Sequence, residues 1–333
     1  MPAAPIHREK SDTRNMKKND IIPGELLAIL ACPDCGGNLA PPGGGRANGD
    51  ALRCEECGRD FEIRNGIPIL YPQDINQTRL AEEEKLGDAM KQAGVSPAGV
   101  EFFSESQWRE SKKEYWIHVK STLGVQPRRM IINIGCGIDT LFLELRELGH
   151  TIIAFDMVFH LLDTLRKKHG SNCNVAGTVK SPPFKKNSFD ALCCIDLIHH
   201  EHAAIPQILE SFRAILKPGG YLFLEDINAW AFYQFPKSIL LPKPLHGVLR
   251  SFYHRLRRSP HRPPDYEFPT SVWHTRRTLA SLGFRDITVV PQRAYPNVCP
   301  VGFKLYTILA RNEYVRRYHN FYYMILTNVK ILI

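Results

Sequence analysis

The stretch "IINIGCGIDT", Ile131 to Thr140, decides the fold of this 333-residue chain. An apolar run enters the pair Gly135 and Gly137, which is typical of a buried strand that turns sharply into a helix. In open α/β sheets, ligands bind beyond the carboxyl ends of the strands, so we expect a ligand at this turn. Two residues raise a question about that site, because Asn133 is uncharged and Asp139 adds a negative charge.

Strand-like and helical patterns alternate from Arg128 onward, which predicts a parallel sheet covered by helices. Residues 129–135, 150–156, 189–196 and 219–227 are expected to be strands, and 140–149, 158–170 and 203–216 to be helices. We expect 276–291 to be a helix, a turn and a strand, and 303–311 to be a further strand.

The second strand ends on Asp156, which indicates an adenosine-containing ligand. A carboxylate about 20 residues after a glycine turn holds ribose hydroxyls in such sheets. A nicotinamide dinucleotide is not expected, because the run G-C-G-I-D-T does not complete G-x-G-x-x-G and Asp139 would repel a pyrophosphate. S-adenosylmethionine has no phosphate and carries a positive sulfonium, so it tolerates a nearby acid.

Several motifs in order resemble the class I S-adenosylmethionine-dependent methyltransferases of the type 11-like kind. They are "IINIGCGID", "IIAFD", "VAGTVKSPPFKKNSFDALCCIDLIHH", "ILKPGGYLFLED" and the later "LASLGFRDITVV". The resemblance covers about Arg128 to Arg311 and implies a Rossmann-like, seven-stranded methyltransferase sheet. It implies that the residues that bind the cofactor S-adenosylmethionine are Asn133, Gly135, Cys136, Gly137, Asp156, Met157, Thr178, Val179 and Asp196.

The same resemblance places Asp196, His199 and His200 beside the methyl group, as candidate catalytic residues. A histidine there could deprotonate a hydroxyl or amine of the acceptor, and local packing of the histidines is the alternative. A metal site in "HHEH" is not expected, because the segment offers no further ligands.

Asn133 and Thr178 depart from the acids that this family often has, and each loss should weaken cofactor binding by about 1 kcal/mol. Asp139 has a structural interpretation as well, since it can cap the helix that begins after it.

Four cysteines near the N-terminus form two Cys-x-x-Cys turns, Cys32 with Cys35 and Cys54 with Cys57. Four thiolates at this spacing are typical of one tetrahedral, structural Zn²⁺. "LLAILACPDC", "LRCEEC" and "FEIRNGIPIL" resemble the small zinc-ribbon proteins that activate tRNA, rRNA and release-factor methyltransferases. The other five cysteines suit packing in a reducing compartment.

The expected organisation is a disordered polar tail at 1–21, a zinc ribbon at 22–72 and a helical linker at 73–127. A methyltransferase domain at 128–312 and an apolar extension at 313–333 follow, the latter to cap the sheet or to touch lipid. A basic insertion at 227–264 has no acid between Asp226 and Asp265. No apolar stretch is long enough to span a bilayer and no secretory signal is present, so we expect a cytoplasmic protein that could meet a membrane surface.

The net charge of +9 favours an anionic partner. We therefore expect O- or N-methylation of a small-molecule or lipid-like anionic acceptor. Two alternatives remain open: a non-catalytic scaffold that kept the fold, and an RNA or protein methyltransferase with a fused activator ribbon. The acceptor and the oligomeric state do not follow from the sequence.

Overall fold

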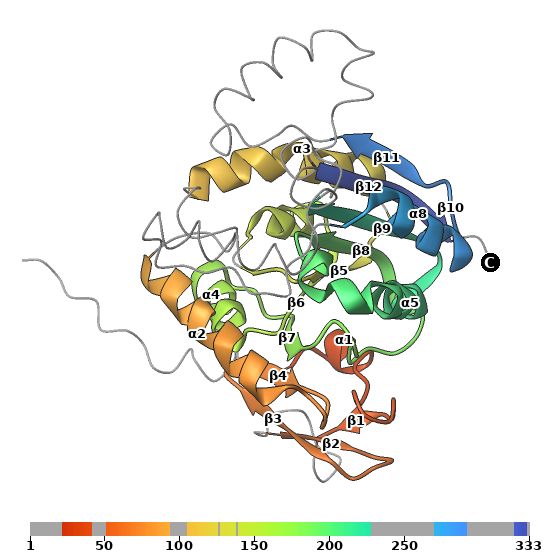
Figure 1. Cartoon of the computed structure of the whole chain (residues 1–333). Coiled ribbons are helices and arrows are strands. Elements are labelled where there is room, and N and C mark those ends of the chain that lie inside the picture. The colour runs from red at the N-terminus through yellow and green to blue at the C-terminus, as the bar shows by residue number, and fades with distance from the viewer. Residues whose placement is uncertain are drawn as a thin grey trace, which may run out of the picture.

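The computed structural model describes residues 22–41, 51–93, 105–125, 127–137, 139–227, 270–291 and 323–331. Figure 1 shows one central sheet with helices on both faces and a small ribbon at one end. The expected tail at 1–21, the strand at 303–311 and the basic insertion beyond Ile227 lie outside the described residues.

The ribbon is an antiparallel meander that ends by joining the main sheet. It comprises α1 (Gly24–Leu27), β1 (Leu39–Ala40), β2 (Ala51–Cys54), β3 (Asp60–Arg64) and β4 (Ile67–Leu70). In β2 and β3 buried and exposed residues alternate, as expected for strands with one covered face. β4 then pairs in parallel with β7 (Asn174–Gly177), Ile69 opposite Ala176, so the ribbon extends the sheet by one strand.

The main sheet confirms the predicted Rossmann-like arrangement of parallel strands and helices. Its other parallel strands are β5 (Met130–Ile134), β6 (Thr151–Asp156), β8 (Phe189–Ile195) and β9 (Leu216–Ile227). They follow the spatial order β7-β6-β5-β8-β9, and antiparallel β12 (Tyr323–Ile331) comes next. Two short strands, β10 (Phe284–Arg285) and β11 (Thr288–Pro291), share the far edge of β12.

Helices cover both faces of this sheet and bury two apolar cores (Figure 1). They are α2 (Gln77–Ala93), α3 (Glu105–Leu123), η3 (Leu141–Arg146), α4 (Phe159–His169), η4 (Ile198–Ala204), α5 (Ile205–Ile215) and α8 (Val272–Ser281). Alternate residues of one strand face opposite cores: Phe223 packs with Tyr115 and Trp116 of α3, whereas Leu224 packs with α5.

Two elements differ from the sequence prediction in kind or place. The segment predicted as a helix at 140–149 is a shorter 3₁₀ helix, Leu141–Arg146, and the left-handed Gly149 lies in the turn that follows it. The apolar segment 313–333, which was expected to cap the sheet or to touch lipid, contributes β12 to the sheet itself.

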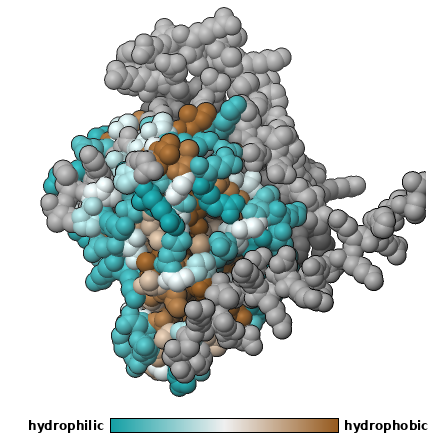
Figure 2. All heavy atoms as spheres, turned by 180° about the vertical axis from the view of Figure 1, so that it is seen from behind, coloured by the Kyte–Doolittle hydropathy of each residue, from teal (hydrophilic) through white to brown (hydrophobic). Residues whose placement is uncertain are grey.

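The surface of the described part is mixed. Seen from behind, hydrophilic residues flank a narrow band of hydrophobic ones (Figure 2). The large exposed apolar side chains are Ile117, Val125, Trp273 and Val289. None of the described helices has the length and apolarity that a membrane span requires.

Candidate active site and metal centre

The carboxyl ends of neighbouring parallel strands gather the predicted cofactor residues at one edge of the sheet. β7, β6, β5 and β8 are consecutive in space, and each ends in a segment that the sequence singles out. The segments are Gly135–Gly137 after β5, Asp156–Met157 after β6, Thr178–Val179 after β7 and Asp196 after β8. The topology therefore brings the whole set together, and their role in binding stays a prediction.

The glycine turn leaves no room for a side chain at Gly135. Gly135 and Gly137 have φ values of +67° and +52°. A Cβ on Gly135 would lie 2.9 Å from Cδ2 of Leu197, which follows β8. Asp156 fixes the turn from β6, because its Oδ2 accepts a hydrogen bond from the Gly137 amide at 2.8 Å. Its Oδ1 accepts from the Val158 amide at 2.9 Å.

Replacing Gly135 with alanine should destabilise the chain by about 1–2 kcal/mol more than replacing Gly124. Gly124 has nearly the same φ, +63°, but nothing lies within 4 Å of its would-be Cβ. Both variants carry the backbone strain, and only Gly135→Ala displaces Leu197. Urea unfolding of the two proteins measures the difference, and equal losses would show that the close approach to Leu197 is unimportant.

Asp139 is buried and satisfied by the protein. Its Oδ2 accepts from Trp116 Nε1 of α3 at 3.0 Å, and its Oδ1 accepts from the Leu141 amide at 2.8 Å. The second contact holds the first amide of η3, which agrees with the expected capping role. The carboxylate thus anchors α3 to the glycine turn.

Other predicted cofactor residues lie in or beside the strands of the same edge. Asn133 is buried in β5, between Ala154 of β6 and Cys193 of β8. The carbonyl of Met157 accepts from the Tyr71 hydroxyl at 2.6 Å. Thr178 Oγ1 accepts from the Lys180 amide at 3.4 Å, and Val179 is buried beside it.

The tips of β8 and β9 carry a buried charged cluster. Asp196 has a left-handed backbone, φ +48°, and its Oδ2 accepts from Lys112 Nζ at 2.7 Å. The same ammonium donates to Glu225 Oε1, and both Lys112 and Glu225 are fully buried. Burial raises the pKa of Glu225 to about 7, against the attraction of Lys112, which lowers it.

His199 and Asp226 form a second buried pair on the opposite face of β9. His199 Nδ1 contacts Asp226 Oδ1 directly, and both side chains are buried. The ring of His200 lies 4.1 Å from that of His199, centroid to centroid. The Asp226 carboxylate thus orients the His199 ring.

Sequence reasoning missed Lys112, Glu225 and Asp226. The two acids stand at the end of the apolar strand "GGYLFLEDI", and acids in that position mark a strand tip, so a signal was available. Lys112 sits in the polar segment "SESQWRESKKEYW", where no pattern distinguishes a buried lysine from its exposed neighbour Lys113.

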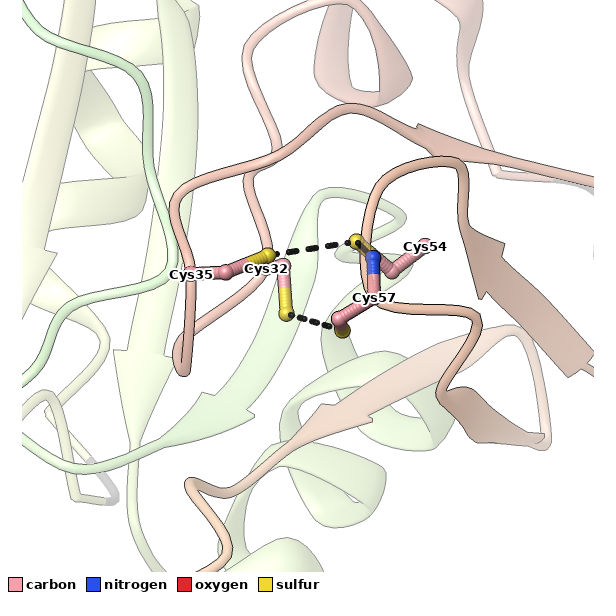
Figure 3. A group of neighbouring side chains, drawn as sticks. All are labelled: Cys32, Cys35, Cys54 and Cys57. Carbon is pink, nitrogen blue, oxygen red and sulfur yellow. Dashed lines mark hydrogen bonds between the residues drawn. The ribbon is translucent and has the colours of Figure 1, made fainter.

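The four predicted cysteine ligands converge in the ribbon (Figure 3). Their sulfur atoms all lie within 4.8 Å of one another. Sγ of Cys32 lies 3.8 Å from that of Cys57, and Sγ of Cys35 lies 3.5 Å from that of Cys54. A tetrahedral Zn²⁺ with sulfur at about 2.3 Å requires sulfur atoms roughly 3.8 Å apart, so the cluster fits this metal.

Backbone amides support the Cys54 sulfur as a thiolate. The Cys57 amide donates to Cys54 Sγ at 3.5 Å. Burial alone would raise the pKa of Cys54, but the amides of Cys57 and Glu56 outweigh it and lower the pKa to about 7. No position of the sulfur set is left for a substrate, which indicates a structural metal.

The first cysteine turn also contacts the segment that follows β7. The Ala31 amide donates to the Pro183 carbonyl at 2.9 Å, and Ser181 Oγ donates to the Pro33 carbonyl at 2.8 Å. An isolated bridge pairs Leu30 with Phe184. This contact and the β4–β7 pair both join the metal centre to the sheet.

Two protein families match this chain, one for each part. The family described as "Methyltransferase domain" matches residues 132–224, and "Trm112p-like protein" matches residues 25–66. The first match spans β5 to β9 with the glycine turn, Asp156 and Asp196. The second spans the four cysteines. Residues 132–224 are therefore similar to a methyltransferase domain and residues 25–66 to a Trm112p-like protein, in agreement with the two resemblances.

Curated relatives are similar to the methyltransferase part. The malonyl-[acyl-carrier protein] O-methyltransferase of Erwinia pyrifoliae is 27% identical over 98 residues, 29% of this chain and 37% of that protein. The ubiquinone biosynthesis O-methyltransferase of Xanthomonas campestris pv. campestris is 31% identical over 110 residues, 31% of this chain and 44% of that one. The chain thus spans less than half the length of these relatives.

Among solved structures, this chain is similar to one chain of the complex between the Haloferax volcanii Trm112 methyltransferase activator and a methyltransferase. The TM-score is 0.46. The two chains are 15% identical, and the match covers 74% of this chain and 96% of that one.

Proposed function

We propose that this protein transfers a methyl group from S-adenosylmethionine to a hydroxyl group of a small-molecule or lipid-like anionic acceptor. The observation that carries the proposal is the shared edge of β5, β6, β8 and β9. There the glycine turn, Asp156 and the His199–Asp226 pair lie at the ends of adjacent strands. N-methylation remains compatible with the same residues.

The residues around the glycine turn fit the cofactor. Asp156 already orders the turn through Gly137, and its carboxylate oxygens keep acceptor capacity for ribose hydroxyls. Gly135 allows a ligand to approach the backbone where a Cβ would strike Leu197. When bound, S-adenosylmethionine supplies an electrophilic methyl group. It contains no phosphate that Asp139 would repel.

His199 is the proposed general base. Asp226 contacts Nδ1 and thereby fixes the ring, and Nε2 is the nitrogen assigned to take the acceptor proton. The carboxylate also stabilises the imidazolium that forms. Asp196 and His200 stay predicted neighbours of the acceptor.

The acceptor class rests on charge and on similarity. The net charge of +9 favours an anionic acceptor. Its anionic group would lie away from the acidic strand tips. Both relatives named above are O-methyltransferases, and both are similar over less than half of their length. Contact with a membrane surface and a cytoplasmic location remain part of the proposal.

Binding of adenosine compounds should weaken as the pH falls below about 6. Burial raises the pKa of Asp156 to about 6, although the amides of Val158 and Gly137 lower it. Protonation removes a charged acceptor from the ribose site, so affinity should fall by up to about tenfold per pH unit below the pKa. Calorimetry with 5′-methylthioadenosine from pH 5 to 8 measures this, with Asp156→Asn expected to show weak binding and no such step.

Labelled cofactor tests the proposal directly. The full-length protein is incubated with methyl-labelled S-adenosylmethionine and separate metabolite, lipid, RNA and protein fractions. Label in the metabolite or lipid fraction, lost in Asp156→Ala, supports the proposal. Label in RNA or protein alone would favour a macromolecular acceptor, and binding without label in any fraction would favour a scaffold.

A further inference from the structure

The charged cluster of Lys112, Asp196 and Glu225 contains more acid than base. Its single ammonium contacts one oxygen of each carboxylate. The second oxygens, Asp196 Oδ1 and Glu225 Oε2, are buried and have no hydrogen-bond partner among the described residues. Buried acceptors without donors are costly, so these two oxygens point to a ligand that supplies positive charge or donors.

The cluster lies beside the glycine turn. β5 and β8 pair in parallel up to Ile134 and Cys194, so Asp196 is close to the turn, and Leu197 contacts the position of Gly135. α3 connects the two features, because Lys112 and Trp116 are one helical turn apart and Trp116 donates to Asp139 of the loop. A molecule bound at the turn therefore has one end near the cluster.

We propose that Asp196 and Glu225 form a subsite for an organic cation beside the glycine turn, with Lys112 as the residue that positions both carboxylates. The inference rests on the proposed function, under which the ligand is the sulfonium and ammonium end of S-adenosylmethionine. These two strand tips then supply the negative charge that Asn133 does not.

The ionisation of Glu225 gives the subsite a measurable signature. The groups that face Glu225 are Lys112 and Tyr115 of α3, Asp196 of the β8 tip and its neighbour Asp226. With a pKa of about 7, Glu225 is partly protonated at neutral pH. A bound cation lowers that pKa, so binding releases a proton, and affinity for the cation rises as the pH increases through about 7.

The first experiment compares three probes by calorimetry. S-adenosylmethionine carries both cations, S-adenosylhomocysteine carries only the ammonium, and 5′-methylthioadenosine carries neither. Glu225→Gln should weaken S-adenosylmethionine binding about tenfold or more and leave 5′-methylthioadenosine binding unchanged, since only the charge is removed. Loss for S-adenosylhomocysteine as well assigns the ammonium to the subsite, and its retention assigns the sulfonium.

Glu144→Gln is the matched control. Glu144 also pairs with a lysine of α3, Lys120 at 2.5 Å, but this pair is partly exposed. The control should bind all three probes as the unchanged protein does. Equal affinity of Glu225→Gln for S-adenosylmethionine, or an equal loss for 5′-methylthioadenosine, would overturn the subsite while leaving the proposed function intact. If the unchanged protein binds none of the probes, the proposed function and the subsite both fail.

A second measurement needs no variant. At pH 7, S-adenosylmethionine binding should release protons, which is visible as a dependence of the binding heat on the ionisation enthalpy of the buffer. 5′-Methylthioadenosine should show no such dependence. Identical buffer dependence for the two compounds would overturn the subsite even if Glu225→Gln fails to fold.

Discussion

Replacing Cys54 with serine should release zinc and lower the unfolding temperature of the whole chain by on the order of 10 °C or more. The ribbon is not a separate unit. Leu26, Leu30 and Leu52 belong to the same apolar core as the sheet residues, and β4 pairs with β7. Loss of the metal should therefore destabilise the sheet in one transition. Zinc analysis and calorimetric unfolding measure both effects.

Cys173→Ser provides the control for this variant. Cys173 is buried in the same core but lies outside the sulfur cluster. It should keep one zinc per chain and lose far less stability. If Cys54→Ser keeps its zinc, the metal assignment is wrong. If the ribbon of that variant unfolds alone at low temperature, the coupling through β4 and the Leu30–Phe184 bridge is wrong.

Replacing His199 with alanine should reduce the rate of methyl transfer by about 10²–10⁴-fold, the usual contribution of a general base. Asp226→Asn should reduce it too, because the ring loses the carboxylate that orients Nδ1. Affinity for S-adenosylmethionine should stay the same in both variants, since the proposed base acts on the acceptor and the cofactor is held by the glycine turn and Asp156. Label transfer and calorimetry separate the two quantities.

His202→Ala serves as the comparison, because His202 lies in the same 3₁₀ helix, η4, and is exposed. It should transfer methyl groups at nearly the normal rate. Equal activity of His199→Ala and His202→Ala would exclude the proposed base. A parallel loss of cofactor affinity in His199→Ala would mean that the histidine supports the fold of the site instead.

The central sheet could be predicted because its information is local. The predicted strands β5, β6, β8 and β9 are apolar runs, and glycines or acids mark their ends, as in Gly135 and Asp156. Cysteine spacing likewise predicted a metal centre whose four sulfurs the fold brings within 4.8 Å.

What could not be predicted depends on contacts between distant segments. The partner of β9 is β12, and nothing in the sequence of Tyr323–Ile331 distinguishes an inserted strand from an apolar tail. Lys112 can be recognised as a site residue only when α3 packs over β8 and β9, because this packing places its ammonium between two carboxylates. The structural role of Asp139 likewise depends on packing, because its hydrogen bond from Trp116 requires α3 to lie against the loop.

Titration of the zinc-loaded, full-length chain with S-adenosylmethionine tests the central claim most directly. We predict saturable binding of about one cofactor per chain, and loss of that binding in Asp156→Ala, whose carboxylate can no longer hold the Gly137 amide or the ribose. The absence of binding heat with both S-adenosylmethionine and S-adenosylhomocysteine, at several temperatures, would contradict the account.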